Sequence, residues 1–246
     1  MIIDILTLFP EAINGVINTS ILKRALDNEL LEINVIDYRE FSNKKNKRVD
    51  DYSYGGGAGM IIEPQPIVDA LKSINGYDKA HKIITSPIGR VFNQNVAKEL
   101  SKLDHIIIVC GHYEGIDERI MHYVDEAISV GDYILTGGEI AALAICDSVS
   151  RLVPSVLGND ESTIDESFSD NLLEYPQYTR PEIYDGHEVP SILLSGNHEE
   201  IRKWRRFKSI ERTYKNRPDL IDEEKLSKED KKFLDDIKNG ATKWKK

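Results

Sequence analysis

The sequence has little cysteine: Cys110 and Cys146 are the only two among 246 residues, and they form no CxxC pair. So few thiols exclude a disulfide-rich secreted scaffold and favour a reduced, cytosolic protein. The six histidines form no HExxH motif and no cluster with cysteine. The spacing therefore predicts no metal site.

Long apolar runs are also lacking, and none approaches the ~20 residues that a membrane-spanning helix needs. The first residues, MIIDILTLFPE, contain neither a basic region nor a small-residue cleavage site. We therefore expect no signal peptide and no membrane association. These absences together predict a cytoplasmic protein.

Positive charge is in deficit, since the formal net charge is −10. That total alone argues against a nucleic-acid-binding protein. Its distribution argues the other way, because Lys44 to Arg48 (KKNKR) and Arg202 to Arg217 form two basic clusters. The second cluster is interleaved with Trp204, Phe207 and Tyr214. Binding depends on local patches rather than on the total, so nucleic-acid contacts and solvated helix faces both stay open.

Short apolar runs alternate with amphipathic segments through the first ~150 residues, as is typical of an α/β fold. The pattern predicts a parallel sheet with helices on both faces. Strands are expected at residues 2–9, 31–37, 82–86, 105–110 and 126–130. Helices are expected at residues 10–30, 66–73, 93–102, 117–124 and 139–149.

A polar, acidic stretch without periodicity, Leu157 to Asn171, interrupts this alternation. We predict a sheet domain at 1–158, a flexible linker at 159–171 and a small, mostly helical domain at 172–246. In the last segment Asn197 can cap a helix from about His198 to Tyr214. Ser227 and Asp230 resemble a capping box that begins the final helix.

The stretch DDYSYGGGAGM, Asp50 to Met60, holds four glycines in five positions. It fails the P-loop motif, because Gly59 is followed by Met60 rather than by Lys and Ser or Thr. It also lacks the third glycine of the dinucleotide-binding motif. A structural turn remains one interpretation, and backbone held close to a ligand, a base or a partner chain is the other.

Three further glycine-bearing loops follow predicted strands, at residues 85–90, 110–115 and 130–139. In open parallel sheets, ligands bind beyond the carboxyl ends of the strands. The three loops therefore predict one shared pocket. Tyr113 and Tyr133 could stack on a ring there, and Glu114 could face a cation.

Seven motifs stand in order along the chain: LTLFPE, DDYSYGGGAGM, CGHYEGIDERI, ISVGDYILTGGE, RLVPSVLGN, LLEYPQYTRPE and LLSGNH. Together they resemble the bacterial tRNA (guanine-N1-)-methyltransferase family, TrmD, along essentially the whole chain. The resemblance implies a SPOUT-type domain with a deep trefoil knot, whose loops hold S-adenosylmethionine. The implied cofactor-binding residues are Ser86, Pro87, Gly111, Tyr113, Glu114, Gly115, Ser129, Val130, Gly131, Asp132, Tyr133, Ile134, Leu135, Gly137 and Gly138.

The resemblance also implies a homodimer in which each active site is built from both chains. The implied substrate is the guanine at tRNA position 37, preceded by another guanine at position 36. Arg151 is the implied catalytic arginine. The family has an aspartate before the pair SF as general base, whereas this sequence has Glu166 there and Asp165 one residue earlier. Register favours Glu166 and leaves Asp165 open.

Further expectations concern the substrate. The basic clusters become candidate phosphate contacts, with Lys44, Arg48, Arg202 and Arg205 as the principal ones. The glycine loop is expected to line the active site near the target guanine and the dimer interface, through Asp50, Gly57 and Gly59. Mg²⁺ dependence enters only through the resemblance, because no spacing of acidic residues marks ligands. A non-catalytic RNA-binding protein of the same fold is the alternative.

Overall fold

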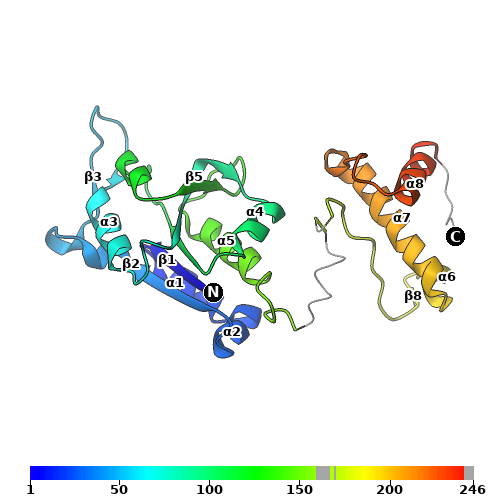
Figure 1. The fold of residues 1–246 in the computed structure, drawn as a ribbon. Helices are drawn as coiled ribbons and strands as arrows, with labels where there is room; N and C mark the ends of the chain where they lie inside the picture. Colours follow the sequence, from blue (N-terminus) through cyan, green and yellow to red (C-terminus); the bar gives the residue numbers. More distant parts are fainter. Residues whose placement is uncertain (159–166, 169, 241–246) are drawn as a thin grey trace. The chain divides into compact units, whose positions relative to one another are not determined.

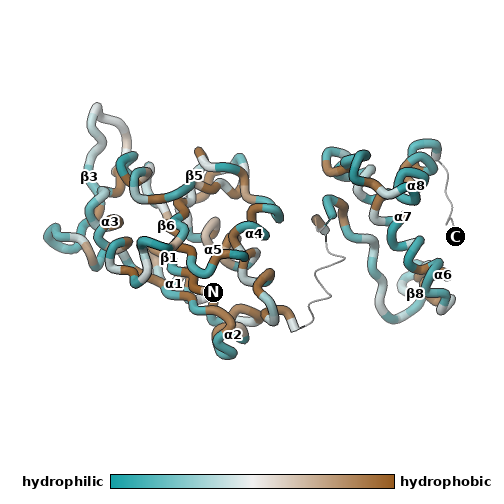
Figure 2. The backbone as a smooth tube through the Cα atoms, viewed as in Figure 1, coloured by the Kyte–Doolittle hydropathy of each residue, from teal (hydrophilic) through white to brown (hydrophobic). Residues whose placement is uncertain are grey.

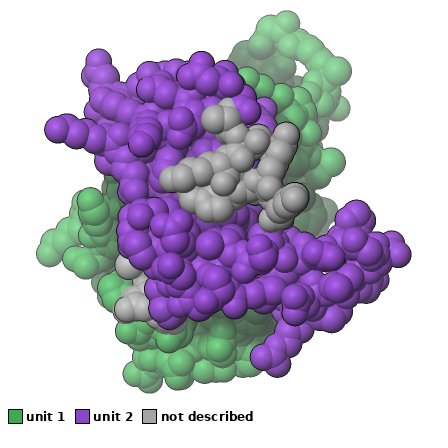
Figure 3. Space-filling view, turned by 90° about the vertical axis from the view of Figure 1, so that its right-hand side faces the viewer, with its two compact units in different colours: residues 1–160 green, residues 161–246 purple. Residues whose placement is uncertain are grey.

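The computed structural model describes residues 1–158, 167–168 and 170–240. The chain divides into two compact units, residues 1–160 and 161–246, which are coloured separately in Figure 3. Unit 1 contains the sheet and unit 2 is mostly helical. Each unit has its own hydrophobic core, so each is described by itself.

Unit 1 is built on a five-stranded sheet with the order β2-β1-β6-β5-β7 (Figure 1). Every neighbouring pair in this sheet is parallel. Parallel strands place their carboxyl ends at one edge, where the connecting loops gather. The strands are β1 (Ile2–Thr7), β2 (Glu32–Asp37), β5 (His81–Val91), β6 (His105–Val109) and β7 (Glu126–Ser129).

Alternation along the strands divides the core into two layers, because successive side chains point to opposite faces. On β6, Ile106 and Ile108 pack in one cluster, while Ile107 and Val109 pack in the other. The first cluster includes buried residues of α1 (Pro10–Ile17), α2 (Ser20–Asp27), α4 (Gln94–Leu100) and α5 (Glu139–Ser150). The second includes those of α3 (Pro64–Ser73) and the 3₁₀ helix η3 (Glu118–His122). Helices on both faces confirm the predicted α/β architecture.

Three local predictions for unit 1 were wrong. The single helix expected at 10–30 is two, because the Asn18 amide and the Thr19 hydroxyl donate to the carbonyls of Asn14 and Val16 and end α1. Residues 117–124 form only η3, which Asp117 caps through the Arg119 amide. The loop expected at 85–90 lies within strand β5, which continues to Val91.

Unit 2 packs α7 (His198–Asn216) against α8 (Lys228–Lys238). Most of α7 is hydrophilic, teal in Figure 2, and its apolar side chains meet those of α8 in one small core. Phe207 and Phe233 meet edge to face there, with ring centroids 5.7 Å apart. The predicted caps are confirmed: Asn197 accepts from the Glu200 amide, and Ser227 with Asp230 forms a capping box.

The remaining regular elements of unit 2 are short: strands β8 (Ile183–Tyr184) and β9 (His187–Glu188), helix α6 (Ser191–Leu194) and the 3₁₀ helix η5 (Pro218–Leu220). Unit 1 adds two 3₁₀ helices, η1 (Tyr38–Phe41) and η2 (Lys45–Lys47).

Within the described residues, no helix combines the length and the apolar character needed to cross a membrane.

The described end of the predicted linker is bonded to unit 2. The Phe168 amide donates to the Leu172 carbonyl at 2.8 Å, which closes a turn. The hydroxyl of Ser167 accepts from the Glu174 amide at 2.9 Å. Asp170 pairs with Arg206 on α7. These bonds anchor the described residues of the predicted linker to the rest of unit 2.

Candidate active site

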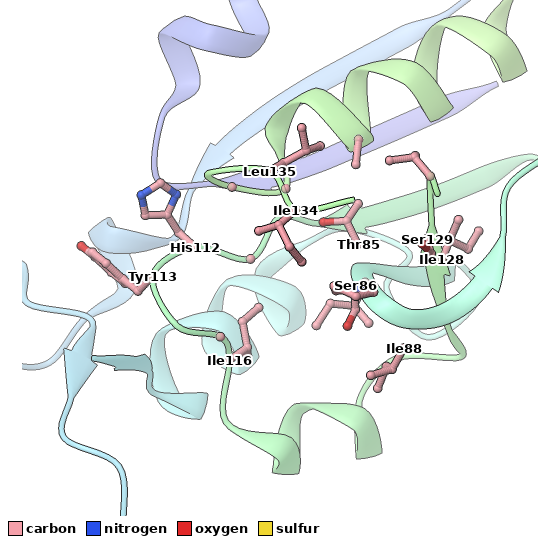
Figure 4. A pocket seen from close by; sticks show the side chains of 18 of the residues that line it. Thr85, Ser86, Ile88, His112, Tyr113, Ile116, Ile128, Ser129, Ile134 and Leu135 are labelled. Atoms are coloured by element: carbon pink, nitrogen blue, oxygen red, sulfur yellow. The ribbon is translucent and has the colours of Figure 1, made fainter. Parts of the chain in front are cut away.

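A cavity of about 400 Å³ opens among three segments of unit 1: residues that interrupt the pairing of β5, and the loops that follow β6 and β7 (Figure 4). Its walls come from residues 84–88, 111–118, 120–121, 128–131 and 133–138, together with Ala141 of α5. The side chains of Ser86, Tyr113 and Ile134 belong to three different loops and surround the same space. The shared pocket predicted from three separate glycine loops is therefore present in unit 1.

The structure brings together all but one of the residues expected to bind the cofactor. Asp132 does not line the cavity. The others do: Ser86, Pro87, Gly111, Tyr113, Glu114, Gly115, Ser129, Val130, Gly131, Tyr133, Ile134, Leu135, Gly137 and Gly138. Their binding role stays a prediction, since geometry establishes only that they face one space.

The first wall is an excursion inside β5. Thr85 and Arg90 both pair with Ile128 of β7, so the chain from Ser86 to Gly89 leaves the sheet and returns. A Cβ at Gly89 would lie 2.3 Å from the backbone carbon of Ala127. Only glycine fits such close backbone packing. Bulge-like irregularities of this kind bend a strand and redirect its side chains, and they are common next to active sites.

The second and third walls are joined through Gly137 and Gly138. His112 and Gly137 form an isolated antiparallel bridge, and the Gly138 amide donates to the Gly111 carbonyl at 2.8 Å. A Cβ at Gly138 would lie 2.2 Å from Thr85 Oγ1 and 2.8 Å from the Gly111 nitrogen. These two glycines let the loops close on one another without a gap.

His112 is a lining residue that sequence reasoning missed, although it stands inside the quoted motif CGHYEG. Its ring lies 4.8 Å from that of Phe9 and 5.0 Å from that of Tyr113. Its Nδ1 is buried and has no hydrogen-bond partner among the described residues. The available signal was its place between two predicted cofactor residues, Gly111 and Tyr113.

Buried polar groups lie next to this wall. Glu139, in the first turn of α5, accepts a hydrogen bond from the Thr7 hydroxyl at 2.8 Å. Burial raises the pKa of the Cys110 thiol well above its usual value, and the Glu139 carboxylate raises it further. Burial likewise raises the pKa of Tyr38, whose hydroxyl donates to the Cys110 carbonyl at 3.3 Å. Both groups are therefore neutral at physiological pH.

The glycine stretch forms a hairpin loop between β3 (Asp50–Asp51) and β4 (Ile61–Ile62). A strand-to-strand loop differs from the strand-to-helix geometry of a P-loop, in agreement with the failed match to that motif. The loop reaches the cavity wall at its end: a Cβ at Gly59 would lie 2.2 Å from Cγ of Glu114. The Glu114 amide donates to the Met60 carbonyl at 3.1 Å, and the Ile62 amide donates to the Gly115 carbonyl at 3.0 Å.

Carboxylates surround the predicted substrate contacts beside this loop. Lys44 lies 2.8 Å from both Asp51 and Glu63, and hydrogen bonds to these two carboxylates raise its pKa. Arg48 lies 3.3 Å from Asp50. Solvent screens exposed pairs of this kind and makes them weak, so a phosphate can replace the carboxylate.

The two arginines expected to contact phosphate on α7 differ from each other. Arg202 is paired with Glu199 at 3.1 Å and with Glu229 at 3.2 Å. The guanidinium of Arg205 instead lies over the ring of Tyr175, 5.0 Å from its centroid. Sequence position alone could not show that carboxylates neutralise the charge of Arg202, whereas Arg205 stacks on a tyrosine ring.

The predicted catalytic residues are placed only in part. Arg151 caps the carboxyl end of α5, whose amino end at Gly138 lines the cavity. Glu166 and Asp165 lie outside the described residues. Among the residues that are described, no group of three or more His, Cys, Asp or Glu could hold a metal ion.

The profile of the family described as tRNA (Guanine-1)-methyltransferase TrmD matches residues 1–223. The chain belongs to this family. The match spans both units, so the family assignment covers the sheet and the helical segment together.

Curated relatives agree over nearly their whole length, and each is called tRNA (guanine-N(1)-)-methyltransferase. The protein of Caldanaerobacter subterraneus subsp. tengcongensis is 54% identical, over 95% of this chain and 97% of its own. That of Clostridium botulinum strain Hall is 55% identical, over 96% and 98%. That of Staphylococcus haemolyticus is 50% identical, over 97% and 98%.

Proposed function

We propose that this protein transfers a methyl group from S-adenosylmethionine to nitrogen 1 of the guanine at tRNA position 37, which a guanine at position 36 precedes. The observation that carries the proposal is the single cavity formed by three glycine loops in a chain of the TrmD family. The deep trefoil knot is part of the same proposal, as is a cytoplasmic location.

The cavity suits S-adenosylmethionine in size and in charge. Its volume lies in the range of ligand sites, about 300–1,000 Å³. No lysine or arginine lines it among the described residues, whereas Glu114, Asp117 and Glu118 do. Such a wall disfavours the phosphates of a nucleotide cofactor and favours a cationic sulfonium. When bound, that cofactor supplies an electrophilic methyl group.

Guanine nitrogen 1 carries a proton and becomes nucleophilic only when the proton leaves. A carboxylate is suited to accept it. We assign that role to Glu166, with Asp165 as the other candidate. Negative charge then develops on the neighbouring carbonyl oxygen of the base. The guanidinium of Arg151 is suited to stabilise this charge, because it is always protonated and donates in a fixed plane.

The length of α5 supports a site made by two chains. The helix has 12 residues between Gly138 at the cavity and Arg151 at its other end. At 1.5 Å per residue, the 13 steps from Gly138 to Arg151 span about 20 Å, and Ala141, which also lines the cavity, lies about 15 Å from Arg151 along the helix. Arg151 therefore does not reach the cavity of its own chain, and we propose that a homodimer supplies it from the partner.

Methyl transfer to two unmodified tRNA transcripts tests the proposal. Labelled methyl should enter the transcript with guanine at position 37 and should not enter one with adenine there. Glu166→Ala and Asp165→Ala, made separately, distinguish the two candidate bases by their transfer rates. A chain that binds both transcripts but methylates neither would be the non-catalytic RNA-binding alternative.

A further inference from the structure

Unit 2 contains a cavity of about 830 Å³ that neither the cofactor nor the methylated base requires. The chain from Tyr175 to Glu182 forms one side, and Ile201, Trp204 and Arg205 of α7 form part of the other. Val189, Leu193 and Leu194 add apolar side chains to the lining. The volume falls within the range of about 300–1,000 Å³ that ligand sites occupy.

Aromatic faces dominate the opening. Tyr178 is 49% exposed, although its ring stands 6.4 Å from that of buried Trp204. The guanidinium of Arg205 covers the ring of Tyr175 at 5.0 Å. A planar cation fixed on an aromatic ring offers its second face for stacking, as the exposed tyrosine does. The opening is therefore suited to a flat aromatic group.

Positive charge at the opening indicates that the flat aromatic group bears a negatively charged substituent. Arg205 is the one lysine or arginine within α7 that no carboxylate or carbonyl of the described residues approaches. The others have such partners: Arg202, Lys203, Arg206, Lys208, Arg212 and Lys215. Arg180, which also lines the cavity, likewise lacks an acidic partner in the described chain, and Glu182 is the single carboxylate in the lining.

We propose that this cavity receives one unstacked nucleotide of the tRNA, separate from the guanine that is methylated. The base stacks between Tyr178 and the guanidinium of Arg205, and the phosphate lies near Arg180. The inference rests on the proposed function for the identity of the RNA. Stacking of a base on an aromatic ring is tolerant of sequence, so the cavity adds affinity more than specificity.

The test uses the full chain and an unmodified tRNA transcript. Tyr178→Ala and Arg205→Gln should each weaken tRNA binding by about 5- to 150-fold, the effect typical of losing one stacked base. Arg180→Gln should instead reduce the salt slope of binding by about 0.7, because Arg180 is the cation placed near the phosphate. Tyr184→Ala and Arg24→Gln, at exposed positions outside the cavity and outside both basic clusters, are matched controls and should stay within twofold.

A second readout locates the RNA. Trp204 and Trp244 are the only tryptophans, so Trp244→Phe leaves Trp204 as the sole emitter. Its fluorescence should change on tRNA addition, and Tyr178→Ala should abolish that change. If Tyr178→Ala and Arg205→Gln both bind tRNA as tightly as wild type, the inference is overturned, even when the wild-type protein transfers methyl normally.

Another contradicting result is a weakened homodimer in Tyr178→Ala, measured by sedimentation, with tRNA affinity per dimer unchanged. A protein surface rather than a nucleotide would then cover the cavity. Failure of the proposed function is a different outcome: tRNA binds and the cavity variants weaken it, yet no methyl is transferred.

Discussion

Gly59 and Glu114 touch across 55 residues of sequence, and no side chain fits between them. Gly59 has a φ of +80°, and a Cβ there would lie 2.2 Å from Cγ and 2.7 Å from Oε1 of Glu114. Glu114 lines the cavity of unit 1. The hairpin loop expected to face the substrate is thus in contact with the wall expected to face the cofactor.

Gly59→Ala should therefore weaken both cofactor affinity and tRNA methylation. Glu114 has to move away from an added methyl group, and we expect the dissociation constant for S-adenosylmethionine, measured by calorimetry, to rise about tenfold, or about 1.4 kcal/mol. Gly55→Ala is the matched control, because Gly55 has a φ of +86° but nothing within 4 Å. An equal loss of cofactor affinity in Gly59→Ala and Gly55→Ala would show that backbone strain, rather than the contact with Glu114, is the cause.

Gly57 is expected to behave differently. A Cβ there meets only Ser53 Oγ, at 3.5 Å, so Gly57→Ala leaves Glu114 in place. We expect it to reduce the rate of tRNA methylation more than the affinity for cofactor. Steady-state kinetics with tRNA, beside calorimetry with S-adenosylmethionine, separate the two quantities. A larger loss of cofactor affinity would assign this part of the loop to the cofactor site.

Gly138→Ala should destabilise unit 1 by about 1–3 kcal/mol, the usual cost of overpacking a core. The new methyl group would meet Thr85 Oγ1 at 2.2 Å and the backbone of Gly111 and Cys110 within 3.0 Å. Gly15→Ala, at an open position in α1, should instead stabilise by up to about 1 kcal/mol. Urea unfolding measures both changes, and a neutral Gly138→Ala would contradict the loop closure described above.

Both cysteine thiols should resist modification in the folded protein. Burial raises the pKa of Cys146 to about 12 and raises that of Cys110 well above its usual value. Only the thiolate reacts, and both side chains are fully buried. A thiol-specific chromogenic reagent at pH 8 should label neither residue until denaturant is added, and then both. One rapid equivalent in the native protein would contradict this.

Unit 2 should lose stability in acid through Asp230. Burial opposes its ionisation, but hydrogen bonds from Arg206 and Ser227 outweigh burial and hold the pKa of this carboxyl below its ordinary value. A carboxyl whose pKa is lower in the folded than in the unfolded state stabilises the fold when the pH is above its unfolded pKa of about 3.9. This stabilisation is lost as the pH falls through the folded pKa.

Asp230→Asn should accordingly cost about 2 kcal/mol at pH 7, the worth of hydrogen bonds to a charged group. The difference from wild type should shrink as pH falls below about 4. Chemical unfolding between pH 7 and pH 3 measures it, with exposed Asp235→Asn on the same helix as control. A difference independent of pH would mean that the Asp230 charge is not the cause.

The predicted strands and caps depended on local signals, and they were found. Runs such as His105 to Val109 are apolar on both faces, as a buried parallel strand requires. The wrong predictions depended on choices that local pattern does not fix. The break after α1 follows from side-chain bonds of Asn18 and Thr19, in a stretch whose apolar periodicity continues into α2.

The site was predictable at the level of loops but not of contacts. Two of the three wall segments follow the ends of β6 and β7 as predicted, because parallel strands place their carboxyl ends at one edge, whereas the third interrupts β5. The closeness of Gly59 to Glu114, and the ion pairs that compensate Arg202 but not Arg205, depend on tertiary packing. No spacing in the sequence encodes those distances.

A crystal structure with S-adenosylmethionine and unmodified tRNA is the most direct measurement of the central claim. The account predicts the cofactor in the cavity between Ser86, Gly111 and Gly138, with a carboxylate oxygen of Glu166 within hydrogen-bonding distance of nitrogen 1 of guanine 37. It predicts Arg151 of the partner subunit beside the carbonyl oxygen of that base. A cofactor bound elsewhere, or a guanine nitrogen that no carboxylate of residues 165–166 approaches, would contradict it.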